Sequence, residues 1–315
     1  IGDDLKILIY LPQGKFAYAS MLGTLMAGSY YTTTNISSPK KVQEKIFRSF
    51  DPDIVISSSE FSYDLESYTK KSIFINVEDL PSNKLQFPKQ TNKIAYVIFT
   101  SGSTGEPKGV IIGNKGLEDY ISWAIDAMEI SPQDRWSQHP NIAFDLSVLD
   151  IYGALCGGAT LFPIIDYRDR LMTAQFIDNN KLTIWNSVPS VIDLMKQTDK
   201  NNSLSLSTLR LMTFCGEPLL KEHLDFIFSI NPKLVVHNTY GPTEATVSCT
   251  LLRLTKTNYI NACNHNVAIG QEIPHMRIFL LDGKNNNEGE IVLSGSQLAF
   301  GYWKDKERNR FSCIY

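Results

Sequence analysis

The segment Thr100–Gly109 combines residue types that can bind a polyphosphate. It reads Thr-Ser-Gly-Ser-Thr-Gly-Glu-Pro-Lys-Gly and directly follows a run typical of a strand. Its glycines let the backbone approach a ligand, its hydroxyls add hydrogen-bond donors, and Lys108 adds a positive charge. This combination suits a triphosphate, although a plain flexible connection has a similar composition. The GxxxxGK[ST] order is absent, which disfavours a P-loop nucleotide hydrolase.

A second segment with chemical potential, Asn238–Thr246, follows an expected strand at 233–236. Tyr240 offers a ring on which a base can stack, and the leading asparagine can hydrogen-bond a purine edge. Thr243 supplies a hydroxyl, and Glu244 supplies a hard oxygen ligand for Mg²⁺. The structural alternative is a Gly-Pro turn beside a buried tyrosine.

The third segment, Phe144–Ile151, places Asp145 inside an apolar run. An uncompensated buried carboxylate is costly, so we expect Asp145 to meet a cation or hydrogen-bond donors. A substrate ammonium would satisfy that requirement. The alternative is that Asp145 caps a helix over 148–154.

Strand-like and helix-like segments alternate through roughly the first 250 residues, which predicts mainly parallel sheets with helices on both faces. Short strands past residue 263 predict a smaller β subdomain. The expected strands are 5–11, 53–57, 72–77, 94–99, 110–112, 276–281 and 290–294, and the expected helices are 16–27, 42–50 and 118–128. The loops of such a fold should carry the chemistry.

The composition of the 315 residues excludes several classes of protein. With 43% apolar and 20% charged residues, the chain is neither disordered nor collagen-like. Thirty basic against 33 acidic side chains leave a charge of −3, so nucleic acid and anionic membranes are not expected partners. No run approaches the ~18 apolar residues of a membrane span, and no secretory signal opens the chain. Five cysteines without CxxC spacing favour a reducing cytoplasm.

In this order, the three segments resemble core motifs of the acyl-adenylate-forming superfamily, specifically its amino-acid adenylation domains. The segments 289–295 and 301–303 add a fourth motif, and the resemblance covers nearly the whole chain. It implies two layered α/β subdomains with mainly parallel sheets and a small β-barrel-like subdomain. The implied divisions are 1–125 with the phosphate loop, 126–262 with the amino-acid and adenine pocket, and 263–315 as a partial β subdomain.

Members of this family use ATP and Mg²⁺ to join a carboxylate to AMP, and then pass the acyl group to a thiol. The resemblance implies that Glu244 is the Mg²⁺ ligand. It implies the following catalytic residues around the phosphates: Thr100, Ser101, Thr104, Lys108, Thr243 and Glu244. It also implies residues around the adenine, with Tyr240 stacked on the base: Asn238, Thr239, Tyr240, Gly216, Glu217 and Pro218.

The resemblance further implies that Asp145 pairs with a substrate α-ammonium, an acid that acyl-CoA synthetases generally lack. The other implied pocket residues are uncharged: Leu146, Leu149, Asn186, Thr213, Cys215, Thr239, Val247 and Ser248. A charged side chain would be left unpaired there, so a small amino acid is expected. Segments around Asp145 and Cys215 resemble D-alanine:D-alanyl-carrier-protein ligases. Trp185–Pro189 instead resembles peptide synthetase domains that activate cysteine and other small amino acids.

The expected function is therefore ATP-dependent adenylation of D-alanine or a similar small amino acid. Transfer to the phosphopantetheine thiol of a carrier protein would follow. An acyl- or aryl-CoA ligase and a truncated, nonenzymatic nucleotide-binding remnant remain alternatives. The family continues past the position of Phe311 to a ribose-binding aspartate and a C-terminal domain with a catalytic lysine. We therefore expect a fragment with both natural ends missing and negligible activity by itself.

Overall fold

The computed structural model describes residues 4–62, 73–77, 92–101, 106–198, 205–285, 288–305 and 309. Contacts divide the chain into two compact units, each built around a sheet of its own. Unit 1 comprises Ile1–Leu117, Asn141–Asp145 and Ala299–Tyr315, and unit 2 comprises Glu118–Pro140 and Leu146–Leu298. The expected α/β architecture with largely parallel sheets is confirmed. The three-part division of the chain at residues 125 and 262 stays a prediction.

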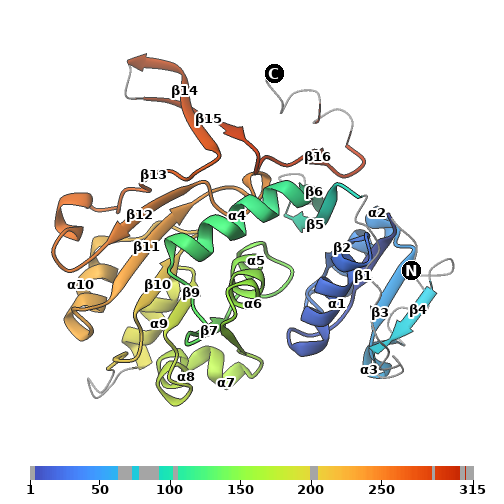
Figure 1. The fold of residues 1–315 in the computed structure, drawn as a ribbon, viewed down its shortest axis with the longest axis horizontal. Coiled ribbons are helices and arrows are strands. Elements are labelled where there is room, and N and C mark those ends of the chain that lie inside the picture. The colour runs from blue at the N-terminus through green and yellow to red at the C-terminus, as the bar shows by residue number, and fades with distance from the viewer. Residues whose placement is uncertain are drawn as a thin grey trace. The chain divides into compact units, whose positions relative to one another are not determined.

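Unit 1 contains a mainly parallel sheet (Figure 1). Its elements are β1 (Lys6–Ile9), α1 (Lys15–Met26), β2 (Tyr30–Thr33), α2 (Lys40–Phe50), β3 (Ile54–Ser57), α3 (Ser59–Ser62), β4 (Ile73–Asn76), β5 (Ile94–Thr100), β6 (Lys108–Gly113) and β16 (Gly301–Tyr302). Among the described residues the strand order is β16-β6-β5-β2-β1-β3-β4. β5, β6 and β16 pair antiparallel, and the other neighbours pair parallel.

The elements of unit 1 follow from its apolar pattern. β1 is buried along Ile7–Ile9, as expected for a strand covered on both faces of a sheet. In α2 the buried Ile46, Phe47 and Phe50 share one side at helical spacing, and Asp51 ends the helix in the left-handed conformation. The strands and helices expected over the first hundred residues are thereby confirmed.

Unit 2 contains the sheet on which most of the predicted site residues lie. Its elements are β7 (Arg135–Gln138), α5 (Leu146–Val148), the π-helical turn η2 (Leu149–Gly153), α6 (Ala154–Cys156), β8 (Thr160–Pro163), α7 (Tyr167–Leu171), α8 (Thr173–Asn179), β9 (Ile184–Ser187), α9 (Ser190–Thr198), β10 (Leu211–Phe214), α10 (Lys221–Ile230), β11 (Val235–Tyr240), η3 (Thr243–Ala245), β12 (Thr250–Leu254), η4 (Tyr259–Ala262) and β13 (Gln271–Glu272). In the described ranges, the strand order is β13-β12-β11-β10-β9-β7-β8. Helix α4 (Asn114–Ala127) begins in unit 1 and ends in unit 2.

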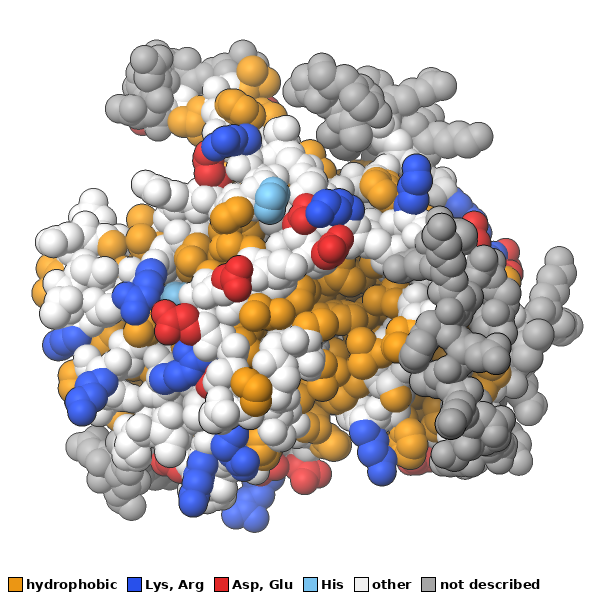
Figure 2. All heavy atoms as spheres, viewed as in Figure 1, with side chains coloured by type: hydrophobic (Ala, Val, Ile, Leu, Met, Phe, Trp, Pro, Cys, Tyr) orange, Lys and Arg blue, Asp and Glu red, His pale blue; other side chains and the backbone are white. Residues whose placement is uncertain are grey.

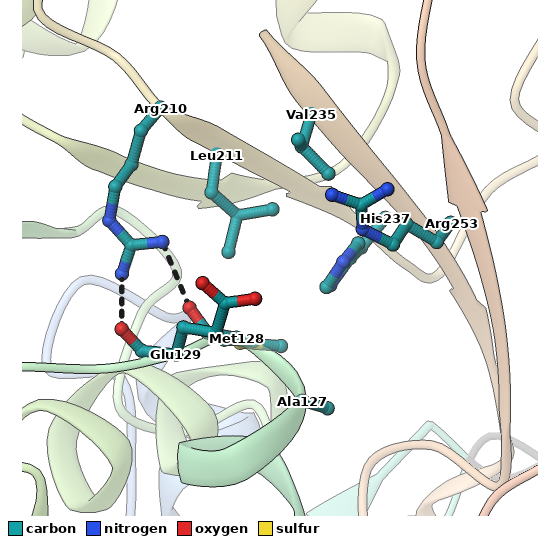
Figure 3. A pocket seen from close by; sticks show the side chains of 8 residues that line it. All are labelled: Ala127, Met128, Glu129, Arg210, Leu211, Val235, His237 and Arg253. Atoms are coloured by element: carbon teal, nitrogen blue, oxygen red, sulfur yellow. Dashed lines mark hydrogen bonds between the residues drawn. The ribbon is translucent and has the colours of Figure 1, made fainter.

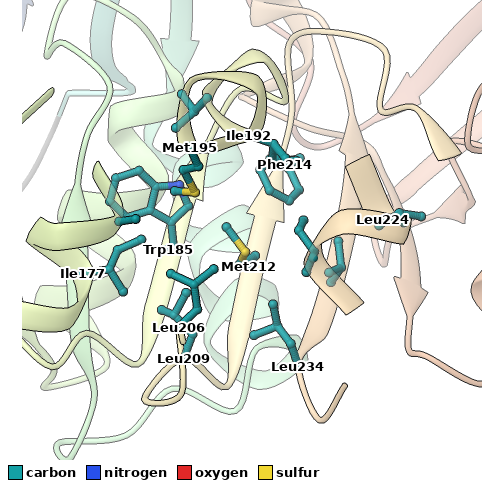
Figure 4. Close-up of a cluster of buried hydrophobic side chains, with 14 of the residues drawn as sticks. Ile177, Trp185, Ile192, Met195, Leu206, Leu209, Met212, Phe214, Leu224 and Leu234 are labelled. Atoms are coloured by element: carbon teal, nitrogen blue, oxygen red, sulfur yellow. The ribbon is translucent and has the colours of Figure 1, made fainter. Parts of the chain in front are cut away.

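One face of the unit 2 sheet packs on a large apolar cluster (Figure 4). Trp185 of β9 and Met212 and Phe214 of β10 are completely buried in it, together with side chains of α8, α9 and α10. Because side chains alternate along a strand, Asn186 and Thr213 lie on the opposite face. They occupy paired positions of β9 and β10. The apolar residues thus anchor one face, and the polar residues line the other.

The last part of unit 2 is a hairpin of β14 (Met276–Asn285) and β15 (Glu288–Gly295). Both strands expected in this region are confirmed and are longer than predicted. The hairpin extends away from the seven strands of the unit 2 sheet (Figure 1).

Charged side chains of both signs are interspersed on the face of the molecule shown in Figure 2. This agrees with the nearly balanced counts of 30 basic and 33 acidic residues. Of the helices in the described ranges, none combines the length and the apolar character needed to cross a membrane.

Candidate functional site

A cavity of about 380 Å³ lies at the carboxyl ends of β10 and β11 in unit 2. Its walls come from the turn after β10, the end of β11 and a segment before β13: Gly216, Glu217, Pro218, Leu219, Asn238, Thr239, Tyr240, Gly241, Asn266, Val267 and Ile269. All the residues expected around the adenine are in this lining. The fold therefore brings two sequence segments, 216–218 and 238–240, to one cavity.

Strand pairing explains why these segments meet. β10 and β11 are parallel, with Phe214 opposite Asn238, so their carboxyl ends open onto the same edge of the sheet. Gly216 has a φ of +89°, a conformation that a side chain would strain. One expectation is corrected: β11 continues to Tyr240 instead of ending at 236, because β12 pairs antiparallel with it along Val236–Tyr240.

Asn238 and Tyr240 present complementary groups to the cavity. The Asn238 side chain is only 4% exposed, and its Nδ2 donates to the Ala268 carbonyl at 2.8 Å. Its Oδ1 can accept a hydrogen bond from an amino group. Tyr240 is 37% exposed, which leaves ring surface for a stacked base. The pair can therefore hold a purine by one edge and one face.

Glu217 has a structural role at this cavity. Its carboxylate accepts a hydrogen bond of 3.0 Å from the backbone N–H of Ser190, the first residue of α9. A carboxylate satisfies an unpaired N–H at a helix N-terminus and interacts favourably with the helix dipole. Because its carboxylate is engaged by the Ser190 N–H, we expect Glu217 to contact a ligand in the cavity through its backbone.

The segment after the cavity is strained and firmly held. Thr246 and Val247 have φ values of 53° and 71°, which are unusual for β-branched residues. Thr246 donates from Oγ1 to the Gln297 carbonyl at 2.6 Å, and the hydroxyls of Ser248 and Tyr120 lie 3.1 Å apart. Strain of this kind persists only where surrounding contacts determine the backbone, and it is frequent at functional sites.

Thr243 and Glu244 lie on η3, directly before this strained turn, and both are half-buried. In the ranges that the structure describes, no group of three or more His, Cys, Asp or Glu side chains is arranged to hold a metal. Mg²⁺ is usually bound by one or two carboxylates together with substrate phosphates and water. A single carboxylate at Glu244 fits this mode of binding, and a dedicated protein cage is not required.

The residues expected in the amino-acid pocket are all buried in unit 2: Leu146, Leu149, Asn186, Thr213, Cys215, Thr239, Val247 and Ser248. Cys215 Sγ lies 3.9 Å from the Val247 carbonyl oxygen. Asn186 Oδ1 and Thr213 Oγ1 are buried with no hydrogen-bond partner in the described part of the protein. Buried polar atoms are normally satisfied, so each of these two needs a hydrogen-bond partner, either from a protonated side chain nearby or from a ligand or water.

Asp145 differs from its expected environment. It is half-buried and directly precedes the helical turn that starts at Leu146, a position where the helix dipole favours a carboxylate. The completely buried acid of this run is Asp150. Asp145 is therefore less buried than its place in an apolar run suggested, because it lies at the start of the helix, and its pairing with a cation stays a prediction. The helix expected at 148–154 is present as α5, η2 and α6.

The phosphate segment belongs to unit 1. Thr100 ends β5 and Ser101 follows it, exposed to solvent. Lys108 begins β6 and pairs with Thr100 in the antiparallel ladder, so it lies in a strand and not in the loop as expected. This pairing places the two residues together at the base of the loop. Thr104 lies outside the described residues.

A second, smaller cavity of about 50 Å³ was not indicated by the sequence (Figure 3). It lies toward the amino ends of β10 and β11 and includes Arg210, His237 and Arg253. Arg210 is held by the carbonyls of Met128 and Glu129, both at 2.9 Å. Burial and the two neighbouring arginines lower the pKa of His237 to about 4. Nothing in the sequence around His237 indicates that two arginines lie beside it.

Three comparisons relate the chain to known proteins. The family described as "AMP-binding enzyme" matches residues 1–303. A D-alanine–D-alanyl carrier protein ligase of Listeria monocytogenes serotype 4b is 30% identical over 97% of this chain, which spans 62% of that relative's length.

Solved structures show the same fold. The Vibrio cholerae adenylation domain AlmE, in complex with glycyl-adenosine-5'-phosphate, superposes with a TM-score of 0.81 at 27% identity. The match covers 98% of this chain and 65% of AlmE. The nonribosomal peptide synthetase FmoA3 has a TM-score of 0.88 at 24% identity, covering 100% of this chain and 34% of FmoA3.

Proposed function

The chain belongs to the AMP-binding enzyme family, and on this basis we propose that it activates a small amino acid with ATP. The products would be an aminoacyl-adenylate and pyrophosphate. D-alanine is the first candidate, because relatives at about 30% identity are named D-alanine–D-alanyl carrier protein ligases. Glycine is the second, since the AlmE structure contains glycyl-adenosine-5'-phosphate.

One observation carries this proposal: the residues expected around the adenine from sequence motifs alone all line one cavity of about 380 Å³. The segments 216–218 and 238–240 that form it are separated by about twenty residues along the chain. Their convergence supports a purine nucleotide as the ligand. The buried, uncharged residues expected beside Asp145 support a small amino acid as the second substrate.

In this reaction the protein acts mainly by positioning and by charge stabilisation. Thr100, Ser101, Thr104 and Lys108 would bind the β- and γ-phosphates, and Thr243 the α-phosphate. Mg²⁺ bound at Glu244 would neutralise charge on the phosphate oxygens. Asp145 would pair with the substrate ammonium and direct the carboxylate toward the α-phosphorus. These assignments rest on the motif resemblance.

We also propose that the aminoacyl group is transferred to the phosphopantetheine thiol of a carrier protein. The names of the relatives support this partner. A cytoplasmic location is proposed with it, because Cys156, Cys215, Cys249 and Cys263 are free thiols and such thiols persist in reducing compartments.

Amino-acid-dependent exchange of labelled pyrophosphate into ATP tests the substrate. The panel is D-alanine, L-alanine, glycine, L-serine and L-cysteine, with L-phenylalanine and L-lysine as bulky and charged controls. We expect the strongest exchange with a small, uncharged member of the panel. A stronger signal from either control would refute the small pocket.

Asp145→Ala separates this proposal from an acyl- or aryl-CoA ligase. Loss of an ion pair to the ammonium should raise the KM for the amino acid by roughly a hundredfold while the KM for ATP changes little. Asp53→Ala, a substitution of a surface acid in unit 1, is the control and should leave both values unchanged. An Asp145→Ala variant with unaltered activation would favour a simple carboxylic acid as substrate.

A further inference from the structure

Asp150 is a completely buried acid beside the expected amino-acid pocket that no motif assigned. It lies in the π-helical turn η2, on the same helix that starts directly after Asp145. π-helical turns are rare and occur frequently at functional sites. A role for this turn can therefore be inferred from the groups that surround Asp150.

The carboxyl group of Asp150 is hydrogen-bonded on one oxygen only. Its Oδ1 accepts from Asn186 Nδ2 at 2.6 Å and from Trp136 Nε1 at 3.2 Å, and all three side chains are inaccessible to solvent. Oδ2 is buried and has no partner in the described part of the chain. A carboxylate in this position would leave a negative oxygen uncompensated, which is strongly unfavourable.

Protonation resolves this arrangement. Burial raises the pKa of Asp150 well above its usual range, against the lowering effect of the hydrogen bonds from Asn186 and Trp136. The nearby titratable ring of His139 is itself neutral at pH 7, because burial and Arg170 lower its pKa to about 4. The imidazole of His139 therefore brings no positive charge that would favour the ionised form of Asp150.

A protonated Oδ2 needs an acceptor, and Asn186 Oδ1 is a buried acceptor without a donor among the described residues. An acid and a primary amide form two complementary hydrogen bonds when they face each other, N–H to O and O–H to O. The first of these is present at 2.6 Å. Asn186 Nδ2 also lies 3.4 Å from the Leu146 carbonyl oxygen, and Leu146 directly follows Asp145.

We propose that Asp150 is a neutral positioning residue whose Oδ2–H donates to Asn186 Oδ1 and thereby holds Asn186 against the backbone of Leu146. Asn186 in turn fixes the start of the helix at Leu146, the residue that directly follows Asp145 in the chain. Asp150 touches neither substrate nor nucleotide and acts only through Asn186. The effect on amino-acid binding rests on the proposed function, whereas the protonation state does not.

Two substitutions at one position test the binding effect. Asp150→Asn keeps a neutral side chain with one acceptor and one donor, so the KM for D-alanine should stay within about threefold. Asp150→Leu removes both groups and should raise that KM about tenfold or more, while the KM for ATP stays nearly constant. If Asp150→Asn is as damaging as Asp150→Leu, the ionised carboxylate is required and the proposal is wrong.

A double-mutant cycle with Asn186→Leu tests whether Asp150 acts through Asn186. We expect Asp150→Leu to add less than about a threefold increase in the KM for D-alanine when Asn186 is already replaced. Effects that multiply in the double variant would show independent action and overturn the proposal.

Stability against pH provides a readout that needs no amino-acid activation. A folded pKa raised above the unfolded one means that unfolding releases a proton, so stability is lost as pH rises above the usual Asp range. Relative to Asp150→Asn, the wild-type protein should therefore lose stability in urea titrations as the pH rises above about 4, the usual pKa of an aspartate. If the difference in unfolding free energy between the two proteins does not vary with pH, or if Asp150→Asn does not fold, Asp150 is not a neutral acid in the folded protein. This conclusion holds whatever the substrate is.

Discussion

Replacing Asp134 by Asn removes a carboxylate that ties together three neighbouring strands of unit 2 at their amino ends. Asp134 directly precedes β7 and accepts hydrogen bonds from Arg210 Nε and Nη2, both at 2.8 Å, and from Thr183 Oγ1 at 2.7 Å. Thr183 and Arg210 directly precede β9 and β10. Because the opposite ends of β9 and β10 carry the candidate site, this cluster helps to set its geometry.

The size of the effect follows from the pKa of Asp134. Burial alone would raise this pKa, but hydrogen bonds from Arg210, Thr183 and Ser131 lower it from 3.8 to about 2. A decrease of nearly two units corresponds to roughly 2–3 kcal/mol of stability at neutral pH. A depressed folded pKa gives stability that is present above the unfolded pKa and is lost as pH falls toward 2. We therefore expect Asp134→Asn to reduce the free energy of unfolding at pH 7 by roughly 2–3 kcal/mol.

Urea titrations from pH 7 to pH 2.5 measure this difference. It should shrink to about half near pH 3, because the wild-type carboxylate is then becoming protonated in the unfolded chain. Asp51→Asn is the matched control: the Asp51 side chain is 66% exposed in its ion pair with Lys6, and its replacement should change stability by less than about 0.5 kcal/mol. A difference for Asp134→Asn that does not vary with pH would refute the reasoning.

Three further predictions concern the site and its sheet. In Gly241→Ala the new Cβ would lie 2.5 Å from Ser248 Cα, so the backbone beside the cavity must shift. The KM values for ATP and for the amino acid, measured by pyrophosphate exchange, should rise roughly tenfold to a hundredfold. Gly23→Ala is the control and should leave both KM values unchanged, because its new Cβ would have no atom within 4 Å. Cys215→Ala should raise kcat/KM for larger amino acids by about tenfold relative to kcat/KM for smaller ones. If the order of kcat/KM among the amino acids is unaltered, Cys215 does not line the amino-acid pocket. Because burial lowers the pKa of His237 from 6.5 to about 4, unfolding takes up a proton between these values. Wild-type stability should therefore fall relative to His237→Leu as pH decreases through that range, and parallel curves in thermal unfolding would contradict this.

Much of the candidate site could be predicted because its residues are grouped in short motifs. The residues expected around the adenine come from two segments, each at the end of a strand, and parallel strands open onto one edge of a sheet. Apolar periodicity was likewise sufficient for α2, where Ile46, Phe47 and Phe50 form a single buried side. The first inference depends on the resemblance of short motifs to those of the family, and the second depends on apolar spacing along the chain.

The sequence by itself indicated the family through its motifs, the alternation of strands and helices through apolar spacing, and several residues of the cavity of about 380 Å³ through the family resemblance. Only the tertiary structure decided which acid is buried. Asp150, and not Asp145, meets Trp136 of β7 and Asn186 of β9, which are 14 and 36 residues away along the chain. The pairing of β12 with β11 likewise continues that strand to Tyr240. Burial and pairing depend on distant partners, and a local pattern does not contain them.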